Sequence, residues 1–333
     1  MESLITRRNS LELLAGGISC AALCARSAFA AVDDYPAKPI TLVNPNPPAG
    51  YTDNLGRVIA PFLSRALGKP VTVTNIPGAS EMLGLEYFLK QPDDGYFILV
   101  VAPSFIPVNI LLQHAPFKVT DFSMVNLPAR DFTLLATSKG GDLKSVNDLL
   151  AALKKDPQRL SVGVPRASTD YINLILLMRA AGVDPAKLRL VTYESGGQVR
   201  SAVIGAVVDC GFAGGEGFLP LVDQIRPLLT FAATRQAPFD APAVPEVNLG
   251  ATFEPVAGSL RGFAVGSSFK DKYPDRYNKL VDAYKTVFAD PKVVASLKNQ
   301  DLASTWYGPE DSEAVYLKTC KQIQNHADLL NGS

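Results

Sequence analysis

Residues 39–67 restrict the fold most, because they combine a strand pattern, a rigid loop and a helix pattern. Residues 39–43 are largely apolar and favour a β-strand, and residues 44–51 hold three prolines and one glycine, which interrupt regular structure. Apolar residues then recur at helical spacing over residues 55–66, and Gly68 stops the pattern. The stretch therefore predicts a buried strand, a tight loop and an amphipathic helix.

The start of this helix predicts an anion site. The first turn of a helix leaves backbone N–H groups unpaired at the positive end of its dipole. Thr52 is the expected N-cap, and Ala49 and Gly50 are small enough for a ligand oxygen to approach the backbone. The loop lacks the GK(S/T) and GxGxxG patterns of nucleotide sites, which favours a carboxylate. The alternative is an ordinary strand-to-helix turn that binds nothing.

Residues 1–30 predict an export signal. An Arg7-Arg8 pair precedes a mildly apolar run, and an A-x-A cleavage motif ends at Ala30. The pair resembles a twin-arginine signal, and Ser10, where that motif usually has phenylalanine, leaves the Sec route open. We therefore expect cleavage near Ala30 and a mature protein in the periplasm.

The mature composition argues against a nucleic-acid partner. The signal removes three of the 32 basic and two of the 32 acidic residues, leaving 29 and 30. Such a balance gives no electrostatic reason to bind a polyanion or an anionic membrane. Two cysteines remain, and Cys210 lies in an apolar run that favours a buried free thiol, although a pair with Cys320 stays open.

The body of the chain alternates strand and helix patterns with short loops, which predicts an α/β fold with mainly parallel sheets. The expected strands are 71–75, 96–101, 160–164, 188–193 and 206–210, and the expected helices are 80–90, 145–154, 170–181 and 198–204. Ligands bind at the carboxyl ends of such strands. The loops there fall into two groups along the chain, which predicts two lobes that face one cleft.

The chain is expected to cross between these lobes twice, near residues 132–137 and 260–265. Lobe 1 then comprises residues 35–134 and 259–333, and lobe 2 comprises residues 135–258. Two crossing strands form a hinge, which suits a protein that closes on its ligand.

Few residues suit catalysis. The only histidines, His114 and His326, have no metal-ligand spacing to each other or to a cysteine pair, and no GxSxG motif is present. We expect no catalytic residue, metal or cofactor. Arginine is the usual bidentate partner of a carboxylate, and Arg166 and Arg200 are the better candidates in the cleft loops, ahead of Arg130 and Arg261.

Several short motifs, in order over nearly the whole mature chain, resemble one family. The segments YPAKPI at 35–40, PPAGYTD at 47–53, NIPGA at 75–79, DGY at 94–96 and VTYESGG at 191–197 match its pattern. The chain resembles the periplasmic substrate-binding proteins of tripartite tricarboxylate transporters, the Bug-type receptors.

The resemblance implies a two-lobed type II periplasmic binding protein fold that binds an organic carboxylate and delivers it to inner-membrane permease subunits. It implies first-lobe loops that hold the carboxylate largely through backbone N–H groups and bridging water. We expect a monomer. The expected ligand-binding residues of lobe 1 are Pro48, Ala49, Gly50, Tyr51, Thr52, Asp53, Ala102, Ser104 and Phe105. Those of lobe 2 are Arg166, Ser168, Thr169, Asp170, Ser195, Gly196 and Gly214.

The departures from the family pattern concern the ligand. Ala49 replaces a loop glycine, and residues 77–81 read PGASE where the family has PGAGG. Tyr51, Phe105 and Ile106 either pack between the lobes or line the cleft, where they would favour an aromatic carboxylate. A module that senses a ligand for a membrane signalling partner remains an alternative, and an exported hydrolase is a weaker one.

Overall fold

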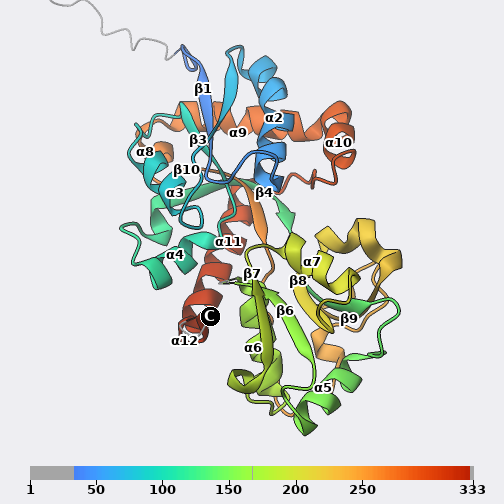
Figure 1. Cartoon of the computed structure of the whole chain (residues 1–333). Helices are drawn as coiled ribbons and strands as arrows, with labels where there is room; N and C mark the ends of the chain where they lie inside the picture. The colour runs from blue at the N-terminus through green and yellow to red at the C-terminus, as the bar shows by residue number, and fades with distance from the viewer. Residues whose placement is uncertain (1–33, 167, 331–333) are drawn as a thin grey trace, which may run out of the picture.

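The computed structural model describes residues 34–166 and 168–330, and the predicted signal at 1–30 lies outside them. The chain forms two lobes, each built around one five-stranded sheet with helices on both faces (Figure 1). Both sheets are mainly parallel, since one strand in each runs against its neighbours. The predicted α/β class is confirmed.

The first sheet has the strand order β2-β1-β3-β10-β4, in which β10 is antiparallel to both neighbours. Its strands are β1 (Ile40–Asn44), β2 (Val71–Asn75), β3 (Phe97–Val101), β4 (Phe122–Arg130) and β10 (Leu260–Gly266). Successive residues of β3 pack into different hydrophobic clusters, because side chains of a strand alternate between the two faces of its sheet. Ile98 packs with α2 (Tyr51–Leu67) and α9 (Pro274–Ala289), and Leu99 packs with α3 (Met82–Leu89).

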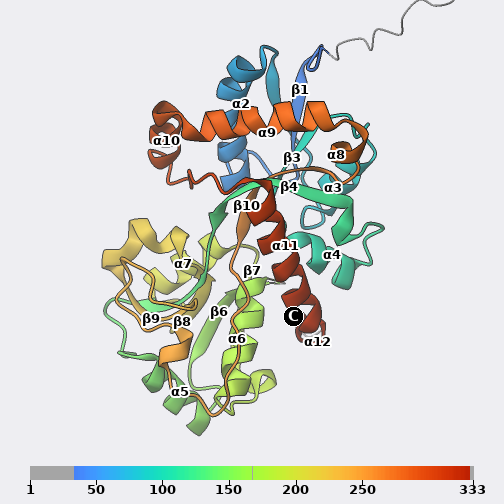
Figure 2. The same ribbon diagram turned by 180° about the vertical axis from the view of Figure 1, so that it is seen from behind.

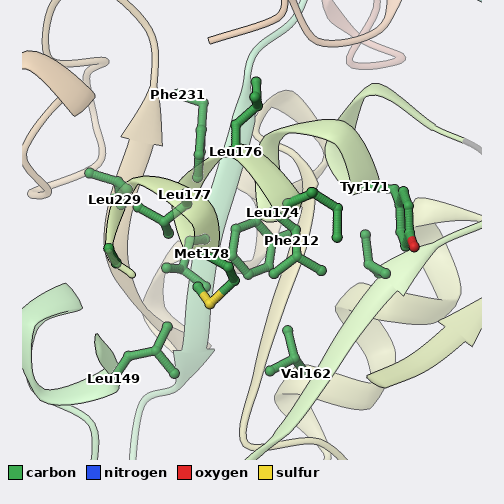
Figure 3. Packing of buried hydrophobic residues seen from close by; sticks show 14 of the residues in the cluster. Leu149, Val162, Tyr171, Leu174, Leu176, Leu177, Met178, Phe212, Leu229 and Phe231 are labelled. Carbon is green, nitrogen blue, oxygen red and sulfur yellow. The ribbon is translucent and has the colours of Figure 1, made fainter. Parts of the chain in front are cut away.

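The second sheet repeats this arrangement in the order β7-β6-β8-β5-β9, with β5 antiparallel to both neighbours. Its strands are β5 (Thr133–Ser138), β6 (Ser161–Pro165), β7 (Arg189–Tyr193), β8 (Cys210–Gly214) and β9 (Ile225–Phe231). Helices α5 (Val146–Lys155) and α6 (Thr169–Ala180) cover one face, and α7 (Gly196–Ile204) covers the other. Figure 3 shows α6 side chains such as Leu174 packed beside Phe212 of β8.

The remaining helices belong mostly to the first lobe and the C-terminal part of the chain. They are α4 (Phe105–Gln113), α8 (Phe269–Lys272), α10 (Pro291–Lys298), α11 (Gly308–Asn325) and α12 (Ala327–Leu330). Helix α11 packs along β4 and α4, and α12 lies beside α6 of the second lobe (Figures 1 and 2). Ile323 of α11 joins the second-lobe core, so the C-terminal segment bridges the two lobes. No helix within 34–166 and 168–330 is both long and apolar enough to cross a bilayer.

The chain passes between the sheets at residues 131–132, between β4 and β5, and again at residues 257–259, before β10. The two passages are hydrogen-bonded to each other: Asp131 N donates to Ser259 O at 3.1 Å, and Gly258 N donates to Asp131 O at 3.1 Å. A Cβ on Gly258 would lie 2.7 Å from Cα of Phe132, so only glycine fits this close approach. The paired passages form the hinge on which the cleft is built.

Some local predictions were wrong, and one helix was missed. The strand expected at 206–210 is β8, Cys210–Gly214; Val207 is 73% exposed, and Gly211 lets β8 pack closely on α7. Helix α4 was not predicted, because Pro107 reads as a loop residue although a first helical turn tolerates proline. Gly50, not Thr52, is the N-cap of α2. Both remaining cysteines are buried and free, as favoured for Cys210.

We predict that Gly258→Ala lowers the free energy of unfolding by about 1–3 kcal/mol, the usual range for an overpacked site. The added methyl group would push apart backbone atoms of the two passages, with Asp131 O only 2.8 Å away. Urea unfolding of the variant and wild type measures the difference. Gly140→Ala, where a Cβ meets no atom within 4 Å, is the matched control. Equal free energies of unfolding for Gly258→Ala and Gly140→Ala would show that a methyl group fits between the two passages, which would contradict the prediction.

Candidate functional site

A cavity of about 660 Å³ lies between the lobes, within the size range of small-molecule sites. The carboxyl ends of β1, β3, β6, β7 and β8 lead into the loops that line it. Both sheets therefore direct their strand ends at one space, as expected for ligand sites in α/β folds.

The loop between β1 and α2 forms one wall and is held by Asp53. This buried carboxylate accepts hydrogen bonds from Ala49 N at 2.8 Å, Arg57 Nε at 2.8 Å and Asn75 Nδ2 at 2.9 Å. Burial raises the pKa of Asp53, but the hydrogen bonds from Arg57, Ala49 and Asn75 outweigh it and lower the pKa to about 2. Ala49 is left-handed, with φ 65°, so the bond to Asp53 also stabilises an uncommon backbone conformation.

The same loop offers backbone donors to the cavity. The first intrahelical hydrogen bond of α2 runs from Asn54 N to Gly50 O at 2.9 Å. The amides of Tyr51 and Thr52, which line the cavity, therefore have no acceptor within the helix. With the positive end of the helix dipole, they form a site for a negatively charged oxygen. The amide of Ala49 is not part of this anion site, because it donates its hydrogen bond to Asp53.

Helix α4 supplies an apolar side to the cavity through Phe105, Val108 and Leu112. Tyr51 also lines it, and its hydroxyl accepts a hydrogen bond from Ala303 N at 2.9 Å. Ile106 is instead fully buried in the first-lobe core. Of the three apolar residues that depart from the family pattern, Tyr51 and Phe105 thus line the cleft, and Ile106 packs inside its own lobe.

The second lobe contributes the N-terminal ends of α6 and α7. Ser168 caps α6, since its Oγ accepts from Tyr171 N at 3.1 Å, and Ser195 caps α7 by accepting from Gln198 N at 3.4 Å. Asp170 Oδ1 accepts from Thr133 Oγ1 at 2.6 Å, and burial raises its pKa to about 6. This wall thus combines polar helix starts with a carboxyl group.

Three arginines and three acidic residues line the cavity, and they differ in their partners. Arg166 forms an exposed ion pair with Glu194 at 3.6 Å. Arg200 and Arg261 form no ion pair within 4.0 Å in the described part of the chain, and no hydrogen bond is found for either there. The acidic residues are Glu81, Asp170 and Glu194.

Glu81 stands at the end of a strained segment. Ala79, Ser80 and Glu81 all have positive φ, at 47°, 50° and 75°, a conformation that costs residues with a Cβ about 1–2 kcal/mol each. The Glu81 Oε1 accepts from Asn46 Nδ2 at 2.7 Å. Burial raises the pKa of Glu81 to about 7, despite that bond. The helix expected from residue 80 starts only at Met82 for this reason.

The structure places 13 of the 16 expected ligand-binding residues on the cavity wall. Asp53, Ser104 and Thr169 do not line it: Asp53 supports the loop, Ser104 precedes α4 and Thr169 is buried at the start of α6. Arg200 and Arg261 line it although neither was among the 16, and Glu81 lines it as well. The two helical residues Val108 and Leu112 could not be found because α4 itself was missed.

Among the described residues that line the cavity, none is a histidine or a cysteine. His114 and His326 lie at helix ends, at the C-caps of α4 and α11, and neither lines the cavity. Within residues 34–166 and 168–330, no group of three His, Cys, Asp or Glu side chains has the geometry to hold a metal ion.

Two lobes whose strand ends meet at one cavity beside a hinge are the arrangement of two-lobed periplasmic binding proteins. Residues 55–324 match the model of the tripartite tricarboxylate transporter family receptor, TctC, and the chain belongs to this family. The predicted resemblance to Bug-type receptors is therefore confirmed.

Known relatives are distant. A protein of Cupriavidus necator, described as "UPF0065 protein in gbd 5'region", is 27% identical over 93% of this chain and 92% of its own. The solved structure of a TctC solute binding protein from Polaromonas, without ligand, matches at a TM-score of 0.72 with 20% identity, over 90% of this chain and 100% of that one. Rpa4515 of R. palustris, solved with adipate, matches at a TM-score of 0.70 with 24% identity, over 89% and 98%. These structures support the fold.

We predict that Asp53→Asn lowers the free energy of unfolding by about 2 kcal/mol at neutral pH, the equivalent of the lowered pKa. Because the folded pKa lies below the unfolded one, this stabilisation is present above about pH 4 and is lost as the pH falls toward 2. Urea unfolding at several pH values measures the gap between variant and wild type.

The exposed first-turn acid Asp275 of α9 provides the control, Asp275→Asn, which should change stability by less than about 0.5 kcal/mol. If the difference in the free energy of unfolding between Asp53→Asn and wild type is as large at pH 3 as at pH 7, the lowered pKa of Asp53 is not the source of this stabilisation.

Proposed function

We propose that this protein is an exported receptor that binds an organic carboxylate between its lobes and presents it to a membrane transporter. The observation that carries the proposal is the start of α2, where Tyr51 and Thr52 line the cavity between the lobes and their backbone amides have no acceptor within the helix or side-chain cap. Free amides at the positive end of a helix bind carboxylate oxygens well. The family assignment and the adipate in Rpa4515 support the same ligand class.

The body of the ligand is expected to lie against Tyr51, Phe105 and Leu112, which give the cavity an apolar side. Burial of a ring-sized or chain-sized apolar group there would contribute about 1.5–3 kcal/mol. A ligand with an apolar body, either a longer aliphatic chain or an aromatic ring, therefore fits better than a small hydroxy acid.

The family and the sequence of the N-terminus support the location and partners that we propose. Residues 1–30 serve as the cleaved export signal, and the mature receptor acts as a monomer in the periplasm, where it delivers its ligand to permease subunits of the inner membrane. Delivery of the closed form to a signalling partner is the alternative, since both roles use the same cleft.

Titration calorimetry with dicarboxylates, tricarboxylates and aromatic carboxylates tests the ligand class. We expect at least one of them to bind with micromolar affinity or tighter, and we expect no chemical turnover of the bound compound. Binding of an uncharged solute, with none of the acids bound, would exclude the proposed class. Conversion of a bound acid to product would favour an enzyme.

We predict that Gly50→Val weakens carboxylate binding by about a hundredfold, because the side chain covers the amides at the start of α2 and each charged hydrogen bond contributes about 1.5–3 kcal/mol. The fold should survive, since a Cβ at Gly50 has its nearest neighbour, Pro47 O, at 3.5 Å. Calorimetry measures affinity, and thermal unfolding checks the fold. Gly140→Val, on a lobe 2 loop outside this cavity, is the control. Unchanged affinity of Gly50→Val would move the anion site elsewhere.

A further inference from the structure

The two arginines without ion-pair partners in the cavity come from different lobes. Arg261 lies on β10 of the first sheet, and Arg200 lies on α7 of the second lobe. Both line the same cavity. Burial is the main cause that lowers the pKa of Arg200; the charge of Asp131 acts to raise it, and the charge of Arg261 acts to lower it. Two positive charges that line one cavity favour the binding of an anion between them. The buried Asp131, whose pKa burial raises and both arginines act to lower, supplies part of that negative charge.

Arg200 is held in a slot that glycines create. A Cβ at Gly217 would collide with its guanidinium, and one at Gly196 would lie 3.2 Å from Nη1. The ring of the buried Phe218 lies beside the guanidinium, with its centroid 5.8 Å from Cζ of Arg200. The slot orients the guanidinium without using its hydrogen-bond donors, which remain available.

Arg261 is oriented by the aromatic ring of Tyr51, which belongs to the same lobe. Its Cζ lies 4.6 Å from the centroid of Tyr51, within the range of a cation–π interaction. The hydroxyl of Tyr51 is itself fixed by Ala303 N, so the ring is a rigid support. Arg261 is therefore fixed on the first-lobe wall of the cavity, beside the ring of Tyr51.

The acidic residues near these arginines have other donors. Asp131 Oδ1 accepts from Phe132 N at 2.8 Å and from Glu216 N at 3.0 Å, while Asp170 accepts from Thr133. Glu81 accepts from Asn46. None of these carboxylates, nor that of Glu216, forms an ion pair within 4.0 Å with Arg200 or Arg261 among the described residues. They lower the charge of the region but leave the guanidinium donors unoccupied.

We propose that Arg200 and Arg261 form a second anion subsite that clamps the far carboxylate of the ligand between the two lobes. The inference rests on the proposed function and narrows it: the ligand is a dicarboxylate whose first carboxylate lies at the start of α2. Guanidinium groups bind carboxylates through paired N–H···O hydrogen bonds, which fix both the group and its direction. Since each lobe contributes one arginine, the second carboxylate also favours the closed arrangement of the lobes.

The test compares matched acids on wild type and on Arg200→Gln and Arg261→Gln. The acids are unbranched dicarboxylates of four to eight carbons and terephthalate, each beside the monocarboxylate of the same skeleton. We expect wild type to bind at least one dicarboxylate about a hundredfold tighter than its monocarboxylate, and each variant to lose most of this preference. Affinity for the monocarboxylate should change less than about threefold in Arg200→Gln, because the monocarboxylate binds at α2 and Arg200 belongs to the other lobe. Arg261 contacts Tyr51 at the start of α2, so Arg261→Gln is judged by the ratio of dicarboxylate to monocarboxylate affinity alone.

Two exposed arginines serve as charge-matched controls, one for each lobe: Arg65→Gln on α2 and Arg179→Gln on α6. Both should keep the wild-type preference. Arg200→Lys retains the charge but not the paired donors, so we expect it to recover only part of the preference even if Arg200→Gln folds poorly. Thermal unfolding without ligand reports on folding.

The outcomes separate the two proposals. Monocarboxylates that bind wild type as tightly as their dicarboxylates, or a preference that survives in Arg200→Gln and Arg261→Gln, would overturn the second subsite and leave the carboxylate receptor intact. Failure of every acid to bind wild type would overturn both. X-ray scattering adds an independent readout, since the dicarboxylate should compact wild type more than its monocarboxylate does.

Discussion

The buried carboxylate of Asp53 is the interaction on which the site depends. It accepts hydrogen bonds from Ala49 N, Arg57 and Asn75. It therefore joins the Pro/Gly loop, the first turns of α2 and the end of β2. The loop carries prolines and a left-handed alanine, and it has few backbone bonds of its own. Because Asp53 fixes it from inside, the helix amides can stay free of internal partners and face the cavity.

The hinge brings a second, side-chain-based anion site to the same cavity. Direct hydrogen bonds between residues 131 and 258–259 keep the two passages together, and they place Arg261, just beyond the second passage, at the border of the lobes. The helix start binds one end of a ligand without any side chain, and the lobe border supplies side-chain charge for the other. Contacts of α12 and Ile323 with the second lobe limit how far the lobes can separate.

The sequence predicted those features that depend on local periodicity and missed those that depend on tertiary contacts. The strand–loop–helix unit ending at Gly68 followed from apolar spacing, and the two-lobed fold followed from its repetition. Strand β8 begins later than predicted, because Val207 before it faces solvent whereas Gly211 is required by packing on α7. The pairing of Arg200 with Arg261 has no local signal, since only the fold brings α7 and β10 to one cavity.

The most direct measurement of the central claim is a crystal structure of the mature protein with a bound carboxylate. The account predicts a ligand oxygen within hydrogen-bond distance of the amides of Tyr51 and Thr52, with the opposite end of the ligand in contact with the second lobe. A carboxylate bound outside the interlobe cavity, or one that leaves the amides at the start of α2 to water alone, would contradict it.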